Sequence, residues 1–222
     1  MTADALTTVL AGAALVAAGA LAWTLGEYLM HRFAMHALQG RGMASREHLT
    51  HHAVYDSVLE KWWFAWMGVV GVGLALGVNT SFVMGSVGWC LGVGWVGGYG
   101  FYDWLHFRAH RREIRRPDSL AGTYERFVRR HHFHHHFGHP TANHGVTTPV
   151  WDLVFGTFER VDGPVRVPRR LAMRWLVDDD GELRPEHADD WVLVGRRLVA
   201  GEDPRQDEID RARAFANLAP TP

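Results

Sequence analysis

Two long uncharged runs dominate the pattern of apolar and polar positions along the chain. Residues 5 to 26 carry no charge over 22 positions, and residues 62 to 102 contain no Asp, Glu, Lys, Arg or His over 41 positions. Roughly 20 apolar residues in a helix cross the hydrocarbon core of a bilayer. The first run therefore predicts one transmembrane helix, and the second is long enough for two. A cleaved signal peptide is the alternative for the first run, but Asp4 stands where a positive region should be.

The second run predicts a helical hairpin. Asn79, Thr80 and Ser81 are expected at its turn, with 17 residues of the run before them and 21 after them. Glycines recur along both arms. They would weaken a helix in water, but in lipid they let two backbones approach closely. We therefore expect the two arms to pack tightly against each other.

Positive charges flank these runs and predict the orientation. Arginines and Lys61 lie between the first run and the hairpin, and five arginines lie between residues 108 and 116, whereas the hairpin turn has no charge. By the positive-inside bias, both flanking segments are cytoplasmic and the N-terminus is outside. Heavy use of Arg, Ala, Gly and Val hints at a GC-rich bacterial genome, so a bacterial inner membrane is the expected location.

The remainder of the chain is polar on average. We expect residues 1 to 160 to form a membrane-embedded domain and residues 161 to 222 a small cytoplasmic extension, with a helix-like stretch at 207–218. Arg126, Arg129 and Arg130 either touch anionic lipid headgroups or form a solvated face, and the sequence leaves both open.

The composition excludes several classes of protein and site. The 222 residues carry a formal charge of -1, so nothing supports whole-molecule attraction to nucleic acid. Cys90 is the single cysteine, which excludes an internal disulfide framework and a thiolate-rich zinc site. Any metal must therefore be held mainly by nitrogen or oxygen, and 15 histidines offer nitrogen.

The histidines lie outside the uncharged runs, at helical spacings. Residues three or four apart share a helix face, so H-x-x-H-H at 48–52 aims three imidazoles in one direction and H-x-x-x-H at 106–110 aims two. Residues 129–140, RRHHFHHHFGHP, contain the H-x-x-H-H pattern twice, as His132, His135 and His136 or as His131, His134 and His135. His31 and His36 diverge by about 140° on a regular helix, so the first helix should bend or end there.

The histidine patterns occur in the same order on either side of the hairpin. A pair, at 31 and 36 or at 106 and 110, is followed by an H-x-x-H-H triplet. This order can bring ten imidazoles to one place, more than one ion accepts, so two metal ions are expected. Imidazole suits iron, zinc, copper and nickel alike. Asp103, one turn before His106, is the first candidate to accept a hydrogen bond from a ligating ring, followed by Tyr102, Glu27 and Glu47; Asp103 is otherwise a helix-entry acid at the membrane surface. His139, His144 and His187 lie outside the pattern and are interpreted as ordinary residues.

Four segments together resemble the fatty acid hydroxylase and sterol desaturase superfamily of integral-membrane di-iron enzymes, and are most similar in style to its fatty acid 2-hydroxylases. They are GEYLMHRFAMH (26–36), REHLTHH (46–52), YDWLHFRAH (102–110) and RRHHFHHHFGHPTANHGVTTPVWDLVFGT (129–157). The resemblance implies an all-α integral membrane fold, with about three to four transmembrane helices under a cytosolic helical cap that holds a histidine-rich dimetal site. Carried over box by box, it implies ten metal ligands: His31, His36, His48, His51, His52, His106, His110, His132, His135 and His136.

The resemblance also implies a reaction and its cofactors. Two iron ions, which zinc can replace in purified protein, would activate O2 and hydroxylate a lipid acyl chain, as in fatty acid or sphingolipid-type 2-hydroxylation. Members that carry a fused cytochrome b5 domain need no separate donor; no such segment fits before residue 5, so an external cytochrome b5-like or ferredoxin-like protein is expected to supply electrons. His144 stands where an aromatic residue is expected, which affects local substrate contacts.

Other functions stay open at this point. A sterol or carotenoid hydroxylase, or a desaturase, would use the same chemistry. A membrane metal-binding or transport protein would need polar ligands within the crossings, and the uncharged runs hold no charged residue or histidine. A hydrolase using zinc-bound water needs an open coordination position and usually a general base, which ten imidazoles fit poorly.

Overall fold

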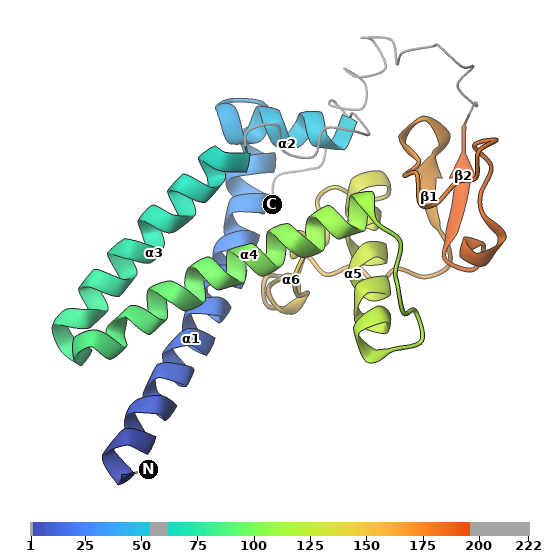
Figure 1. Cartoon of the computed structure of the whole chain (residues 1–222). Coiled ribbons are helices and arrows are strands. Elements are labelled where there is room, and N and C mark those ends of the chain that lie inside the picture. Colours follow the sequence, from blue (N-terminus) through green and yellow to red (C-terminus); the bar gives the residue numbers. More distant parts are fainter. Residues whose placement is uncertain (1, 54–61, 196–222) are drawn as a thin grey trace. The chain divides into compact units, whose positions relative to one another are not determined.

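The computed structural model describes residues 2–53 and 62–195, which are mostly helical (Figure 1). The helix-like stretch expected at 207–218 lies outside the described residues. The elements in chain order are α1 (Ala3–Leu29), the π-helix η1 (Met30–Ala37), α2 (Met43–Ala53), α3 (Trp62–Met84), the 3-10 helix η2 (Gly85–Gly88), α4 (Trp89–Arg111), α5 (Leu120–Phe137), α6 (Val150–Phe155), β1 (Val165–Pro168), the 3-10 helices η3 (Arg169–Leu171) and η4 (Pro185–His187), and β2 (Trp191–Val194).

The described residues form two compact units, 2–27 with 62–104 and 28–53 with 105–195. In the first unit α3 and α4 form the expected hairpin (Figure 1). Its arms touch through backbone, because a Cβ on Gly92 would lie 2.1 Å from the carbonyl oxygen of Gly73. A Cβ on Gly94 would likewise lie 2.1 Å from the carbonyl oxygen of Val16 in α1. The predicted role of glycine in close helix packing is confirmed at these positions.

Two helical segments are long and apolar enough to cross a membrane by length and composition, Ala3–Ala37 and Trp63–Arg111. The second contains both arms of the hairpin, since it folds back at η2. Both segments are therefore candidate membrane spans, and the number of crossings stays a prediction.

The position predicted for the hairpin turn is wrong. Residues 79–81 remain helical and the chain reverses at Gly85–Gly88, where Gly85 has a φ of 59°. The polar side chains stay in the helix because they bond its own carbonyls: Asn79 Nδ2 donates to the oxygen of Ala75 at 2.7 Å. Glycine takes a positive φ without steric cost, so Gly85 ends the arm instead.

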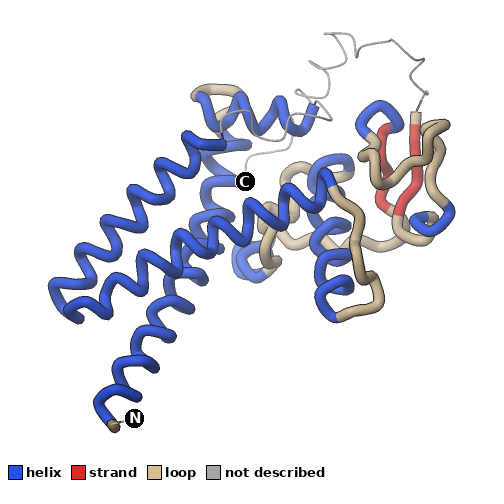
Figure 2. Tube along the Cα trace, viewed as in Figure 1, coloured by secondary structure: helices blue, strands red, loops and turns tan. Residues whose placement is uncertain are grey.

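The second unit contains a small sheet as well as helices. Two strands, β1 and β2, lie side by side (Figure 2), and they pair in parallel with Val165 opposite Trp191. The all-α expectation is therefore wrong for this part of the chain. Four-residue strands with one buried face leave too short an alternation to predict from sequence. Around the sheet, residues 165–191 form a hydrophobic cluster with Phe133 of α5, and Trp175 Nε1 donates to the oxygen of Ala109 at 2.9 Å.

Of the three arginines considered for lipid headgroups, Arg129 is a core residue instead. Its side chain is 1% exposed, it donates to Glu125 Oε1 at 2.5 Å, and its guanidinium carbon lies 4.6 Å from the ring centroid of Trp175. Arg130 and Arg126 both pair with Asp190. The two pairs with Asp190 tie α5 to the residue before β2, and the Glu125 carboxylate compensates the buried charge of Arg129.

Candidate metal centre

The first histidine pair lies on a helix that changes its winding. α1 continues into the π-helix η1, which carries both His31 and His36. A π-helix bonds residue i to i+5, so residues five apart come round to nearly the same face. The two rings accordingly lie 5.2 Å apart between centroids. As expected, the helix ends next to this pair, at Ala37, and the wider π-helical turn brings the two rings closer than a regular helix would.

The triplet on α2 is held against η1 by a buried serine. Ser45 Oγ donates to the oxygen of Met35 at 2.6 Å and accepts from the N–H of Gly40 at 2.8 Å. Gly40 has a φ of 81°, which allows the tight connection between the two helices. α2 therefore aims His48 and His52 at the histidines of η1, whereas His51 faces the histidines of α4 and α5, and all three rings are buried.

The remaining ligands come from α4 and α5. α5 begins at an N-cap, where Ser119 Oγ accepts from the N–H of Gly122 at 3.0 Å, and ends at Gly138. Of the two overlapping H-x-x-H-H patterns on α5, the structure brings together with the other histidines the one that begins at His132: His132, His135 and His136. His131 and His134 point elsewhere, His131 Nε2 lying 3.5 Å from Asp152 and His134 Nε2 lying 3.5 Å from Glu159.

All ten predicted ligands gather into two buried groups of five, with the potential ligand atoms of each group within 4.8 Å of one another. We call them the first set and the second set. The first set consists of His31, His36, His48, His52 and His135, and the second set consists of His51, His106, His110, His132 and His136.

In the first set the Nε2 atoms converge on a common point. His48 Nε2 lies 3.0 Å from that of His31, 2.9 Å from that of His36 and 3.0 Å from that of His52. The Nε2 atoms of His36 and His135 are 3.0 Å apart. Two ligands at right angles around an ion with metal–nitrogen distances of about 2.1 Å would be about 3.0 Å apart. The spacing therefore fits ligands that surround one ion.

The second set repeats this geometry. The Nε2 atoms of His51 and His106 lie 3.1 Å apart, and those of His110 and His132 lie 3.0 Å apart. His136 Nε2 is buried and has no hydrogen-bond partner among the described residues. An orphaned buried nitrogen is costly unless something binds it. A metal ion fits this position as it fits the first set.

Hydrogen bonds on the outer side of two rings set their tautomers. His31 Nδ1 donates to the carbonyl oxygen of His144, and His135 Nδ1 donates to that of Ala142 at 2.8 Å. Because a carbonyl only accepts, the proton of each neutral ring is on Nδ1 and the lone pair of Nε2 faces the centre of the first set. Lone pairs crowded at 3 Å repel one another without a cation between them.

The loop that supplies these two carbonyls is anchored by Asp152. This carboxylate is fully buried and accepts from the N–H of His144 and from the N–H of Gly145, both at 2.8 Å, and from Thr157 Oγ1 at 2.8 Å. Asn143, with a φ of 59°, adds bonds in both directions with the backbone of Glu159. Burial alone would raise the pKa of Asp152, but these donors and His131 hold that pKa well below its usual value.

Sequence reasoning missed both His144 and Asp152 as parts of the site. His144 is 2% exposed, and its ring centroid lies 5.5 Å from that of His31 and 5.3 Å from that of His135. A cue was available for Asp152, because an acid flanked by Trp151 and Leu153 interrupts an apolar stretch. No spacing rule pointed to His144, since its backbone carbonyl makes the contact.

The four candidates for hydrogen-bonding partners of the ligands lie on α1, α2 and α4. Tyr102 and Asp103 belong to the first unit, where the Tyr102 ring lies 5.9 Å from that of Trp23. Glu27 is buried in the same unit, and Glu47 lies on α2. A role for these four residues at the metal site stays a prediction.

The electrostatics of the sets favour neutral imidazoles. Burial, and then the neighbouring rings, hold the pKa values of His48, His52, His132, His135 and His136 well below the ordinary 6.5. Metal binding requires unprotonated nitrogen. These rings are therefore ready to bind a cation at neutral pH.

A pH dependence of stability follows for the metal-free protein. Unfolding exposes histidines that protonate near their ordinary pKa, whereas the folded state resists protonation. The stability that these rings contribute is therefore fully present about one pH unit above 6.5 and is lost as the pH falls, by up to about 1.4 kcal/mol per pH unit for each such ring. Melting temperatures of metal-free protein in detergent should drop between about pH 7.5 and 5.5. A melting temperature that rises or stays level on acidification would contradict this expectation, and the metal-loaded protein is the control.

Comparison with known proteins places these boxes in a family. The sequence profile described as fatty acid hydroxylase matches residues 16–157. A dihydroceramide fatty acyl 2-hydroxylase of Arabidopsis thaliana is 28% identical over 161 residues, which cover 64% of this chain and 60% of that protein. A ceramide very long chain fatty acid hydroxylase of Saccharomyces cerevisiae is 29% identical over 154 residues, covering 66% of this chain and 38% of that protein.

A fatty acid 2-hydroxylase of Homo sapiens is 27% identical over 145 residues, covering 63% of this chain and 38% of the human protein. The chain thus spans between about two fifths and three fifths of the length of these relatives. No solved structure matches it. The matched region contains all four histidine boxes and the loop anchored by Asp152. The chain belongs to the fatty acid hydroxylase family.

Proposed function

We propose that this protein is an O2-dependent di-iron hydroxylase of a lipid acyl chain, acting near the polar end of a fatty acid or sphingolipid-type substrate. The observation that carries the proposal is the pair of buried five-histidine sets. The names of the relatives support acyl 2-hydroxylation. Iron is favoured over the other metals that imidazole binds by the chemistry of that reaction, which inserts oxygen into an unactivated C–H bond.

The protein would hold two metal ions, orient their ligands and shield the ions from bulk water. Ten neutral imidazoles would bind two ions, with His31 and His135 oriented by the carbonyls of residues 144 and 142. Bound iron would supply O2 activation, in which one oxygen enters the lipid C–H bond and the other leaves as water, using two electrons and two protons from an external donor. Every imidazole of both sets is buried, which keeps bulk water from the ions.

The order of elements along the chain supports access from the bilayer. His31 follows the uncharged run at residues 5–26 after four residues, and His106 follows the hairpin run after three. The site would then lie at the membrane boundary, on the cytoplasmic face of a bacterial inner membrane. A lipid could enter sideways and present carbons just below its headgroup. A separate cytochrome b5-like or ferredoxin-like protein would deliver the electrons.

Lipid profiling of cells that express the protein tests this function. Wild-type protein should produce lipids 16 daltons heavier, with the added oxygen derived from labelled O2. His51→Ala should reduce this product to background, because it removes one ligand of the second set. His187→Ala, which changes a histidine outside both sets, is the control. A product that persists in His51→Ala or forms without O2 would defeat the proposal, and a loss of two hydrogens would indicate a desaturase.

Metal analysis of anaerobically purified protein, together with a flux assay, distinguishes the proposed hydroxylase from the second candidate class, a membrane metal transporter. A hydroxylase should contain two irons per chain, and zinc after aerobic purification would reflect replacement of lost iron. A transporter would instead show metal flux across proteoliposomes. The uncharged runs offer no charged residue or histidine for such a path.

A further inference from the structure

The short helix α6 buries an acidic side chain and exposes apolar ones, the reverse of a helix on a water-exposed surface. Its one buried residue is Asp152. Its apolar side chains point outward, with Val150 45%, Leu153 60%, Val154 63% and Phe155 47% exposed. A helix packed on a protein core shows the reverse, apolar inside and polar outside. A contiguous exposed apolar face marks a surface that something else covers.

Contacts at the end of α6 join it to Tyr28, near the C-terminal end of α1. The ring of Phe155 stacks on that of Tyr28, with centroids 5.2 Å apart and planes 13° apart. Tyr28 Oη and Thr157 Oγ1 lie 2.9 Å apart. Tyr28 follows the end of the uncharged run at Gly26 by two residues, about 3 Å along the helix. α6 therefore lies next to α1 at Tyr28, two residues after the uncharged run ends.

The surroundings of this position are those of a membrane interface. Arg32 Nη1 donates to Tyr28 Oη at 2.6 Å, which places a cation four residues beyond Tyr28 and six beyond the end of the apolar run. Trp151 of α6 lies 6.3 Å from Phe155 between ring centroids. Tyrosine and tryptophan concentrate where hydrocarbon meets headgroups, and arginines lie just outside it. These neighbours favour lipid as the cover of α6.

We propose that the α6 face formed by Val150, Leu153, Val154 and Phe155 is inserted into the cytoplasmic leaflet of the bilayer at headgroup depth. This contact is separate from any crossing, since α6 has six residues and cannot span. The buried side of the same helix carries Asp152, which holds the loop that orients His31. One short helix therefore joins the lipid surface to the first set.

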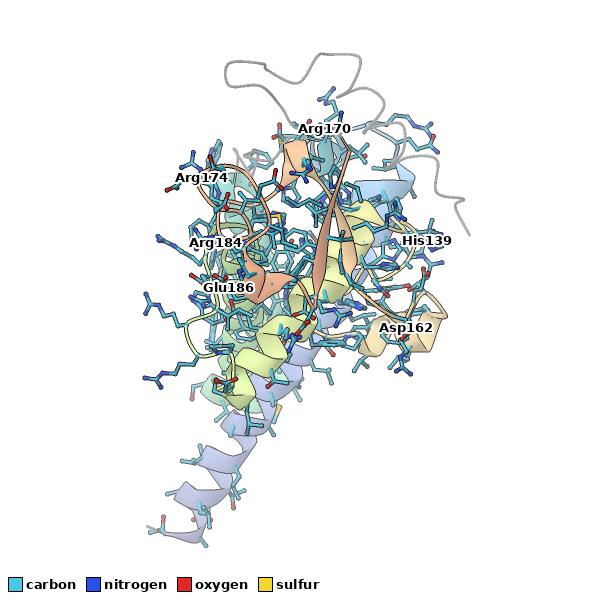
Figure 3. The ribbon with its side chains drawn as sticks, turned by 90° about the vertical axis from the view of Figure 1, so that its right-hand side faces the viewer. His139, Asp162, Arg170, Arg174, Arg184 and Glu186 are labelled. Atoms are coloured by element: carbon cyan, nitrogen blue, oxygen red, sulfur yellow. The ribbon has the colours of Figure 1, made fainter. Side chains whose placement is uncertain are left out.

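Fluorescence quenching in lipid nanodiscs tests the insertion. In a Cys90→Ser background, Leu153→Cys or Val154→Cys is labelled with bimane. Quenching by phosphatidylcholine nitroxide-labelled near the headgroup is then compared with quenching by aqueous iodide. Leu10→Cys in the first apolar run is the lipid-facing control, because Leu10 is 60% exposed there. Glu186→Cys in η4 is the aqueous control, on an exposed polar side chain (Figure 3).

Both α6 labels should be quenched by the lipid nitroxide as strongly as the Leu10 label and be protected from iodide. Iodide quenching equal to that of the Glu186 label would overturn the proposal. Protection from both quenchers would also overturn it, since a second copy or another protein would then cover α6. The readout needs neither bound metal nor turnover, so the result stands whether or not the proposed hydroxylase activity is found.

Discussion

His135→Ala is expected to lower the metal content from about two ions per chain to about one and to abolish lipid hydroxylation. His135 is fully buried, and its Nε2 lies 3.0 Å from that of His36 at the centre of the first set. Alanine removes one of five ligands and leaves the carbonyl of Ala142 without its donor. The second set keeps all five of its imidazoles. Elemental analysis of anaerobically purified variant and wild-type protein measures the difference.

His139→Ala is the matched control, because this histidine lies four residues away at an exposed position (Figure 3). Its ring pairs with Glu159 and belongs to neither set. Metal content and activity should stay at the wild-type level. If His135→Ala retained two ions, or if both variants lost metal equally, the assignment of His135 as a ligand would be wrong.

Asp152→Ala is expected to weaken metal binding by about 10- to 100-fold, the range seen when a group that orients a metal ligand is removed. The change leaves the N–H groups of His144 and Gly145 without their acceptor, at a cost of about 1–3 kcal/mol of stability for each. The carbonyl of His144 then no longer holds His31 in place. Metal titration of the metal-free protein, with melting temperature beside it, gives both quantities.

Asp152→Asn separates positioning from folding. Asparagine keeps one acceptor oxygen and the shape of the side chain, so its metal affinity should lie between those of wild type and Asp152→Ala. Asp162→Asn is the control for loss of an acidic charge, since the Asp162 side chain is 77% exposed (Figure 3). Wild-type affinity in Asp152→Ala would show that the loop holds its shape without the carboxylate.

The histidine boxes were the most predictable part of the site. Spacings of three and four residues determine which imidazoles share a helix face, so the triplet on α2 and the pair on α4 could be assigned from the sequence. All ten predicted residues lie in the two sets. How the ten divide was not predictable, because His51 and His52 are adjacent in the chain but belong to different sets.

Irregular backbone was the least predictable part. The π-helical turn at Met30–Ala37 brings together a pair that a regular helix would separate, and no composition rule indicated it. The hairpin turns at Gly85 and not at the polar residues 79–81, because Asn79 donates a hydrogen bond to a carbonyl of its own helix and Gly85 adopts a positive φ. The strands at 165–168 and 191–194 are four residues long and pair across more than twenty others, so their pairing depends on contacts far apart in sequence.

The sequence by itself determined the apolar helices, the family and the identity of the imidazoles, because apolar length and helical spacing are local properties of the chain. Only the tertiary structure decided which imidazoles form each set, that backbone carbonyls 142 and 144 orient two of them, and that Asp152 anchors those carbonyls. The physical reason is that every backbone carbonyl has the same chemistry. Which carbonyl accepts a hydrogen bond from a particular histidine ring depends on the path of the folded chain. The identities of the side chains do not indicate it.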